Sequence, residues 1–339
     1  MNQPPALPPG VAVFQIASSA IAVQALWTAA ELGIADHVSD QPASAAELAA
    51  KVHANPDALY RMMRFLTMLG IFREAGDQSF VQTPMSETLR SDHPGRMRAA
   101  VRLLSSGSFW RALGQFGEAV RTGETAWTIT HGKPIFDYFP DHPEEGALFN
   151  DAMIGIHGAE PPAVAEAYDF SGLETVVDVG GGSGNMMINI LQRHPDPRGI
   201  VFDLPPAAEA ARERIEAAGL SSRCSAVAGD FFESVPDGAD AYVLSHIIHD
   251  WDEARCVSIL ERCRRAMKPG GRVLIVEMVV PGPNEPHPAK LLDLVMLTVP
   301  GGRERTAEEY AALLARAGLR LERIVPTASP VSVVEAFAA

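Results

Sequence analysis

The second half of the chain alternates short apolar runs of strand character with longer amphipathic segments. This rhythm is typical of βαβ units, which build a mostly parallel sheet. The runs predict strands at 174–179, 199–203, 224–228, 240–245 and 272–277. The segments between them predict helices at 184–194, 206–218, 253–268 and 306–317. The pattern therefore predicts an α/β fold.

The last two apolar runs, 319–327 and 331–338, are joined by only Ala328, Ser329 and Pro330. A parallel crossover needs a dozen or more residues. These two strands must therefore form an antiparallel hairpin at the end of the sheet.

The first half of the chain has helical patterning and begins with an uncharged segment at 11–30. Its length and composition meet the first test for a membrane span. Polar residues within it and the lack of a preceding Lys or Arg disfavour a span or a signal peptide. We expect a buried helix ending near Gly33, with a subunit interface as one place for it. Residues 1–10, which include four prolines, are expected to form a loose arm.

Two capped helices are predicted next. The helix at 44–52 begins with Ser44 and has Glu47 three residues on, which is a capping-box pattern. The helix at 55–70 begins with Asn55, a favoured N-cap residue.

Residues 71–83 follow these helices and predict two short strands, so this region has the outline of a winged helix. That outline suggests a DNA-binding module. The second capped helix carries Arg61 and Arg64, but most of its surface is apolar: Met62, Met63, Phe65, Leu66, Met68 and Leu69. We expect this helix to be buried rather than to lie in a DNA groove.

Residues 95–160 are expected to be largely helical, and Pro161–Pro162 together with the cluster around Ser171 and Gly172 mark the start of a second domain. The predicted organisation is a winged-helix domain at 1–95, a helical linker at 96–162 and an α/β domain at 163–339.

Composition narrows the function classes. The formal net charge of −14 disfavours nonspecific nucleic-acid binding, which depends on basic residues that neutralise phosphates. The three cysteines have no CxxC spacing, so neither a zinc site nor a disulfide framework is indicated. A reducing, cytoplasmic setting fits this cysteine content.

A glycine cluster, DVGGGSG at 178–184, joins the first predicted strand of the second domain to a helix. Glycines at such a turn allow positive φ and let a ligand approach the main chain. In open α/β sheets, ligands bind outside the carboxyl ends of the strands. We therefore expect an adenosine-containing cofactor at this turn.

The spacing of this cluster discriminates between cofactors. A dinucleotide fingerprint requires a sixth-position glycine, but counting from Gly180 gives Asn185 and counting from Gly182 gives Met187. No P-loop lysine follows either. Asp203 closes the second strand, where an acid can accept both ribose hydroxyls of NAD or S-adenosylmethionine. Together with the terminal hairpin, these features favour S-adenosylmethionine.

From about residue 15 to the end, the chain resembles the caffeate-type and hydroxyindole-type O-methyltransferases. The segments that carry the resemblance are FNDAM (149–153), DVGGGSG (178–184), FDLP (202–205), GDFFESVPDGADAYVLSHIIHDWDE (229–253), VLIVEMVVP (273–281) and LLDLVMLTVPGGRERT (291–306).

The resemblance implies a class I methyltransferase sheet of Rossmann-like type and an N-terminal winged-helix dimerisation domain that closes the partner's pocket. It implies methyl transfer from S-adenosylmethionine to a hydroxyl of an aromatic or polyketide-like small molecule, with S-adenosylhomocysteine as the product. The expected enzyme is a homodimer that binds neither nucleic acid nor membrane.

The resemblance also assigns a general base, His249. A phenol has a pKa near 10, and a neutral histidine within hydrogen-bond reach can remove its proton. Glu277 and Glu304 match the two acids that orient this histidine in the family. His246, His249 and Asp250 could instead be metal ligands, but a further ligand would have to come from elsewhere. We expect no metal, and we expect His246 to pack beneath the site.

The remaining implied residues surround the cofactor and the acceptor. Those at the cofactor are Asp178, Gly180, Gly182, Asp203, Leu204, Asp230, Phe231 and Ser245, the last where plant members often have a lysine. Those at the acceptor are Trp110, Phe149, Asn150, Met153, His157 and Met296. Ordinary core packing is the alternative role for the apolar residues of this second set.

Two other functions stay open beside methyl transfer. Some family members bind the cofactor but run another reaction, such as hydroxylation. A winged-helix regulator that senses S-adenosylmethionine is a non-enzymatic alternative. The set of His249, Glu277 and Glu304 favours methyl transfer. The motifs leave open the identity of the acceptor and whether oxygen or nitrogen is methylated.

Overall fold

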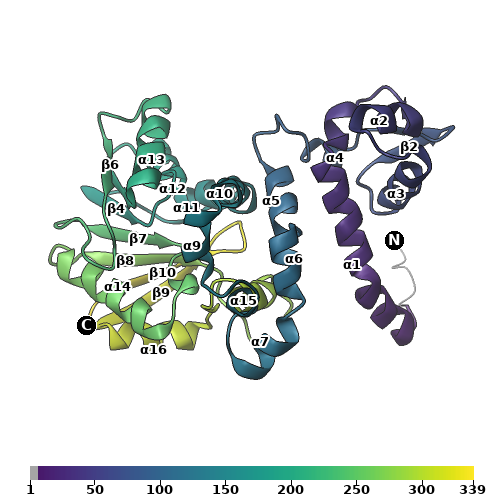
Figure 1. The fold of residues 1–339 in the computed structure, drawn as a ribbon. Coiled ribbons are helices and arrows are strands. Elements are labelled where there is room, and N and C mark those ends of the chain that lie inside the picture. Colours follow the sequence, from purple (N-terminus) through teal and green to yellow (C-terminus); the bar gives the residue numbers. More distant parts are fainter. Residues whose placement is uncertain (1–6) are drawn as a thin grey trace. The chain divides into compact units, whose positions relative to one another are not determined.

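The computed structural model describes residues 7–339, and these form two units (Figure 1). One unit contains the chain up to Arg111 together with Tyr138–Gly158. The other contains Ala112–Asp137 and Ala159–Ala339. Most of the predicted arm lies outside the described residues, but Pro9 and Gly10 already belong to a helix, so that part of the prediction is wrong.

A seven-stranded sheet in the order β6-β5-β4-β7-β8-β10-β9 forms the centre of the second unit. Its strands are β4 (Thr175–Val179), β5 (Arg198–Asp203), β6 (Cys224–Ala228), β7 (Ala241–Ser245), β8 (Arg272–Glu277), β9 (Leu319–Pro326) and β10 (Ser332–Ala338). Strands β4 to β8 pair in parallel, whereas β10 runs antiparallel to both β8 and β9. The predicted sheet and its closing hairpin are confirmed.

Helices cover both faces of this sheet. Because side chains alternate along a strand, Val176 and Val243 pack on one face, while Val177 and Leu244 pack on the other. The first face is covered by α11 (Glu160–Ala167), α12 (Asn185–Arg193) and α13 (Pro205–Ala217), and the second by α14 (Glu253–Ala266) and α16 (Ala307–Arg316).

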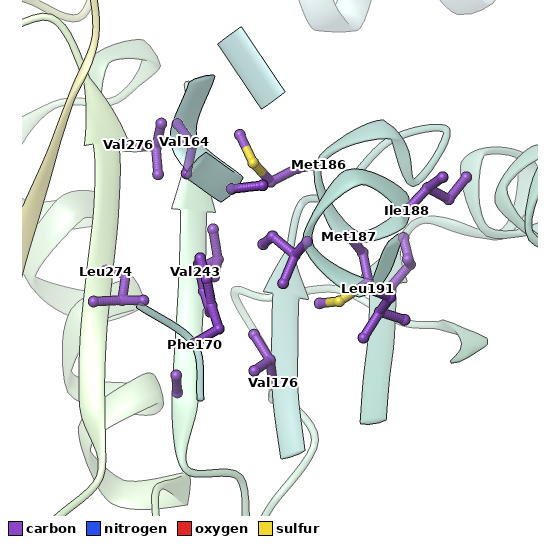
Figure 2. Packing of buried hydrophobic residues seen from close by; sticks show 14 of the residues in the cluster. Val164, Phe170, Val176, Met186, Met187, Ile188, Leu191, Val243, Leu274 and Val276 are labelled. Atoms are coloured by element: carbon purple, nitrogen blue, oxygen red, sulfur yellow. The ribbon is translucent and has the colours of Figure 1, made fainter. Parts of the chain in front are cut away.

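Figure 2 shows Met187 and Leu191 extending from α12 toward the strands. Strands buried on both faces read as continuous apolar runs, which is why they could be predicted. The three cysteines, Cys224, Cys256 and Cys263, are also buried.

The first unit contains the predicted helices and hairpin. Its early elements are α1 (Pro9–Glu31), η1 (Ile34–His37), β1 (Ala43–Ser44), α2 (Ala45–Val52), α3 (Pro56–Met68), β2 (Arg73–Gly76) and β3 (Ser79–Val81). The Ser44 hydroxyl accepts the Glu47 N–H at 3.2 Å, and the Glu47 carboxylate accepts the Ser44 N–H at 2.8 Å. The Asn55 side chain accepts the Ala58 N–H at 3.0 Å. Both predicted caps are therefore confirmed.

Helix α3 is less buried than its composition suggests. Leu59, Met63 and Leu66 lie in the core of the first unit, but Met68 and Leu69 are exposed at its C-terminal end. Burial had been expected over most of its surface, and for these last two residues that prediction is wrong.

Helical structure dominates the middle of the chain, as predicted for 95–160. The helices are α4 (Pro84–Glu87), α5 (Met97–Leu104), α6 (Gly107–Leu113), α7 (Phe116–Thr122), α8 (Ala126–His131), α9 (Ile135–Tyr138), η2 (Phe139–Asp141) and α10 (Pro143–His157). A further helix, α15 (Ala289–Thr298), was not predicted.

Helix α1 leaves large apolar side chains on its surface. Phe14, Ile16 and Ile21 are each more than 70% exposed, at 71%, 74% and 71%. The helix is long and apolar enough to cross a membrane by length and composition, a test that core helices of soluble proteins also pass. Among the described residues of the first unit, nothing buries these three side chains.

The C-terminal hairpin is joined to the sheet by a buried glutamate. Glu335 on β10 accepts hydrogen bonds from the Tyr168 hydroxyl, from Arg272 Nη1 at 3.2 Å and from Arg323 Nε at 2.5 Å. Burial by itself raises the pKa of Glu335, but the bonds from Tyr168 and Arg323 outweigh it and hold this pKa below its usual value.

We expect Glu335→Ala to lower the free energy of unfolding by about 3 kcal/mol, because it leaves buried donors unpaired. The matched control is Glu322→Ala on β9, whose exposed ion pair with Arg320 should contribute less than about 1 kcal/mol. A carboxylate with a lowered folded-state pKa stabilises at neutral pH and loses this effect as the pH falls below about 4. Urea unfolding at pH 7 and pH 4 checks both points, and equal losses for the two variants would contradict them.

Candidate active site

The carboxyl ends of neighbouring strands bring the predicted cofactor residues to one edge of the sheet. Strand β4 lies between β5 and β7, so the chain departs in opposite directions on either side of it. Such a switch point is where open α/β sheets bind ligands. The glycine loop follows β4, Asp203 ends β5, and Ser245 ends β7.

The glycine loop is shaped by backbone conformation and close packing. Gly180 and Gly182 have φ of 70° and 54°, a region that favours glycine. A Cβ on Gly180 would overlap with the side chain of Ile247, and one on Gly181 would lie 2.7 Å from Asp178 Cγ. A Cβ on Gly182 would meet no atom within 4 Å. The first two glycines are thus required for packing, whereas the third borders open space where a ligand can approach the main chain.

Two acids support this loop. Asp203 accepts the Gly182 N–H at 2.8 Å and the Leu204 N–H at 2.6 Å. Burial raises the pKa of Asp203 despite these two bonds. Asp178 is fully buried beneath the loop, and burial, with the nearby charge of Asp203, raises its pKa to about 7.

Aromatic rings lie beside the loop. Phe231 packs 3.4 Å from the Cβ position of Gly180, and its ring centre lies 6.2 Å from that of Trp251. Phe136 stacks on Trp251 with ring centres 5.8 Å apart. Asp230 is exposed next to this cluster and accepts the Phe232 N–H at 2.7 Å.

These residues fit S-adenosylmethionine. The open space over Gly182 suits a ligand at the main chain, the Asp203 carboxylate retains acceptor capacity for hydroxyls, and aromatic faces suit an adenine. Leu204, also predicted at the cofactor, is 55% exposed at the start of α13. Trp251 and Ile247 were not predicted, although the HDW segment contained the signal for Trp251.

His249 is held through its ring and its main chain. Its Nδ1 lies 2.6 Å from Glu304 Oε1, and its main-chain N–H donates to Glu277 Oε1 at 3.0 Å. All three residues are buried. When Glu304 is ionised, Nδ1 carries the proton and Nε2 is left as an acceptor, 3.6 Å from Asp250 Oδ1. The structure therefore brings the three predicted catalytic residues together, with Glu277 holding the main chain.

Burial, with added effects of neighbouring carboxylates, raises the pKa of two carboxyl groups near His249, Glu277 and Asp250. Burial raises the pKa of Glu277, and the charge of Glu304 adds to this, although His249 and the hydroxyl of Tyr310 oppose it. Burial, Glu277 and Glu304 raise the pKa of Asp250 well above its usual value. A concentration of acids in one buried place favours a positive charge on the imidazole between them.

The GGRERT segment passes directly over the main chain of His249. The Arg303 N–H donates to the His249 carbonyl at 2.9 Å, and a Cβ on Gly302 would overlap with that same carbonyl oxygen. The Glu304 N–H donates to Asp293 of α15 at 2.9 Å. The glycine thus permits the approach, and α15 fixes Glu304.

His246 lies near this group. Its ring centre is 5.0 Å from that of His249, and its Nε2 lies 2.6 Å from Glu160 Oε2. Its backbone has a φ of 54°, which is uncommon for a residue with a side chain.

The predicted acceptor residues lie on three helices. Phe149, Met153 and His157 share one face of α10 at a spacing of four, and Asn150 is exposed on the same helix. Trp110 lies on α6, and Met296 is buried on α15, one turn from Asp293. Met296 is thus the member of this set that the second unit contains.

Comparison with known families identifies the chain. A family model described as the O-methyltransferase domain matches residues 110–320, and one described as the O-methyltransferase dimerisation domain matches residues 14–92. The chain belongs to the O-methyltransferase family. The resemblance noted in its motifs is confirmed.

Individual relatives cover nearly the whole chain. It is 43% identical over 335 residues to the phenazine O-methyltransferase of Lysobacter antibioticus, covering 99% of this chain and 98% of that one. Against the crystal structure of LaPhzM the TM-score is 0.93 at 42% identity, with 98% and 100% of the two chains covered.

A relative solved with its ligands identifies the cofactor. It is an O-methyltransferase of neocarzinostatin biosynthesis, crystallised with S-adenosylmethionine and 2-hydroxy-5-methyl naphthoic acid. It matches with a TM-score of 0.81 at 36% identity over 94% of this chain and 96% of that one. The chain is an S-adenosylmethionine-dependent O-methyltransferase.

We expect Gly302→Ala to lower methyl transfer at least about 100-fold, because a displacement of His249 by about 1 Å can have such an effect. The matched control is Gly117→Ala on α7, where the added Cβ meets no atom within 4 Å. S-adenosylmethionine binding, measured by calorimetry, should be retained by both variants. Full turnover by Gly302→Ala would show that this close approach does not position the histidine.

Proposed function

We propose that this enzyme methylates a hydroxyl of a small aromatic molecule and that His249 is the general base. The observation that carries the proposal is the buried imidazole held at Nδ1 by Glu304, 2.6 Å away, and at its main chain by Glu277. This arrangement leaves Nε2 as the nitrogen able to accept a proton.

The cofactor, when bound, supplies an electrophilic methyl group. His249 removes the acceptor's hydroxyl proton through Nε2 as the new bond to oxygen forms. The positive charge that then develops on the imidazole is stabilised by the Glu304 carboxylate at Nδ1. Glu277 contributes by fixing the main chain, so the ring does not have to reorganise during the reaction.

Cofactor binding is proposed for the residues at the strand ends. We assign Gly180 and Gly182 to the amino-acid part, Asp203 and Leu204 to the ribose, and the remaining predicted positions to the adenine and the floor of the site: Asp178, Asp230, Phe231 and Ser245. The open space over Gly182 and the ring of Phe231 beside Gly180 support this assignment.

A flat, fused aromatic acceptor is proposed from the relatives. One of them is a phenazine O-methyltransferase, and another acts on 2,7-dihydroxy-5-methyl-1-naphthoate. The walls of the acceptor site are proposed to be Trp110, Phe149, Asn150, Met153, His157 and Met296. We also retain as proposals the domain limits at 95 and 162 and a cytoplasmic location.

Other chemistries occur among the relatives. An aclacinomycin 10-hydroxylase of Streptomyces purpurascens is 35% identical, and an 8-amino-8-demethylriboflavin N,N-dimethyltransferase of Streptomyces davaonensis is 33% identical. The His249–Glu304 pair supports O-methyl transfer here, because a proton acceptor is needed for a hydroxyl nucleophile.

We expect His249→Ala to lower kcat at least about 100-fold, the contribution typical of a general base. Cofactor affinity should be unchanged, since His249 is not among the proposed cofactor residues. His37→Ala, which alters an exposed histidine of the first unit, is the control.

The assay uses radiolabelled S-adenosylmethionine with hydroxyphenazines, hydroxynaphthoates and aminophenols as acceptors. Label in the ether product of the first two classes supports the proposal. Turnover that survives in His249→Ala, label on nitrogen only, or a hydroxylated product without label would contradict it.

The homodimer formed by this family is proposed to bury the apolar surface of α1, which belongs to the matched dimerisation domain. We expect the double variant Phe14→Glu/Ile21→Glu to dissociate, because it places two charges one above the other on that helix. Ala46→Glu/Ala50→Glu adds the same charge to exposed positions of α2 and should remain dimeric. Analytical ultracentrifugation distinguishes the outcomes, and a stable dimer of the first variant would place the interface elsewhere.

A further inference from the structure

Arg305 is a buried cation directly after Glu304. Its side chain is 1% exposed, although burying an isolated charge is costly. Within residues 7–339 it forms no ion pair, and its Nε has no hydrogen-bond acceptor. Pairing with a carboxylate therefore does not explain why an arginine is buried at this position.

Its guanidinium contacts the two segments that hold His249. Nη1 donates to the Ile248 carbonyl at 3.2 Å and to the Arg303 carbonyl at 3.3 Å, and Nη2 lies 3.5 Å from Cys256 Sγ. Ile248 precedes His249 in the chain, and the N–H of Arg303 holds the His249 carbonyl. The guanidinium thus connects the loop after β7, which carries Ile248 and His249, to the GGRERT segment.

The main chain of Arg305 is itself fixed to the sheet. Its carbonyl accepts the Val280 N–H at 2.8 Å, and it forms a bridge with Val279, just beyond β8. The guanidinium therefore extends from a main-chain position that is fixed by hydrogen bonding just beyond the end of β8.

The surroundings of His249 are strongly acidic. The titratable groups that face it within the second unit come from several elements: Glu160 with His246, Asp250, Cys256, Glu277, Glu304, Arg305 and Tyr310. Burial raises the pKa of Tyr310 well above its usual value, Glu277 and Glu304 add to this, and Arg305 opposes them. Arg305, the one permanent cation among these groups, therefore acts on the same side chains as the acids.

We propose that Arg305 is a positioning residue for His249. It fixes the Ile248 and Arg303 carbonyl groups on either side of the histidine's contacts, and it adds a buried positive charge to the group of titratable side chains around His249. This inference rests on the proposed role of His249 as the base.

The charge effect has a defined sign. Loss of a nearby cation favours protonation of both the imidazole and the carboxyl groups. A protonated His249 cannot act as a base, and a protonated Glu304 no longer holds the Nδ1–H tautomer. Both changes move the acidic limb of the pH profile to higher pH.

The test compares kcat/KM from pH 5 to pH 9 for the wild-type dimer, Arg305→Met and Arg305→Lys. We expect the acidic limb of Arg305→Met to move up by about 1 pH unit, equivalent to a tenfold loss on that limb. Arg305→Lys should restore the limb, because the charge is kept, but with a reduced kcat, because the guanidinium contacts are lost. Arg316→Met, which removes an exposed arginine of α16, should leave the profile unchanged.

Lower activity or thermal stability with an unmoved limb in Arg305→Met would mean a merely structural role and would overturn the proposal. If Arg305→Met does not fold, Arg305→Gln keeps donors for Ile248 without charge and has the same two outcomes.

A second readout separates this inference from the proposed function. The ¹⁵N chemical shifts of the His249 ring are titrated in the S-adenosylhomocysteine-bound dimer, with His249→Ala identifying the signal. A titration that moves in Arg305→Met, in an enzyme whose His249→Ala variant stays active, would support the Arg305 inference and overturn the base. A titration that does not move in Arg305→Met, together with an inactive His249→Ala variant, would support His249 as the base and overturn the Arg305 inference.

Discussion

The site depends on two carboxylates buried at the edge of the sheet, Glu277 and Glu304. Buried carboxylates are costly unless hydrogen-bonded and compensated by positive charge. Here one residue contacts both acids: Glu304 Oε1 lies 2.6 Å from Nδ1 of His249, and Glu277 accepts the main-chain N–H of His249 together with the Tyr310 hydroxyl. The same contacts orient the histidine and, in its proposed role as the base, favour the charge it acquires. Stability of the loop and catalysis are thus linked.

The fold supplies this arrangement with little flexibility. Glu277 is the last residue of β8, a strand with both faces buried, so its position is set by the sheet. Glu304 is held by Asp293 of α15, and the segment that carries it crosses the His249 carbonyl at a glycine. On the neighbouring strand ends, the glycine loop and Asp203 form the proposed cofactor side. Proximity of the two sides follows from the strand order, since β4 and β7 are adjacent.

Much of this fold could be predicted from the sequence because its signals are local. The continuous apolar runs of the strands, the Ser44 and Asn55 caps and the short link at 328–330 each involve residues close in the chain. Helix α15 gave no such signal: it has no side-chain N-cap, and it is apolar on most of its faces. The apolar composition of α1 predicted a buried helix, but not which surface covers Phe14, Ile16 and Ile21, which stay exposed within its own unit.

The site was predicted as a set of residues, but not how they interact. Glu277 accepts the main-chain N–H of His249 and not a ring N–H. This depends on how far β8 extends relative to the loop after β7, which the spacing of residues in the sequence does not reveal. Asp293, Tyr310 and Arg305 were missed because they act on residues that are themselves distant in sequence. Gly302 belongs to one of the motifs, but the sequence does not show why a glycine is needed there. The need is steric, because any side chain at this position would overlap with the His249 carbonyl.

The central claim is that Glu304 holds His249 as the Nδ1–H tautomer with Nε2 as the proton acceptor. The most direct test is two-dimensional ¹H–¹⁵N NMR of the histidine rings at neutral pH with S-adenosylhomocysteine bound. We predict that the His249 proton resides on Nδ1 in the wild type and that Glu304→Ala abolishes this preference. A proton on Nε2 in the wild type, or a tautomer unaffected by Glu304→Ala, would contradict the claim.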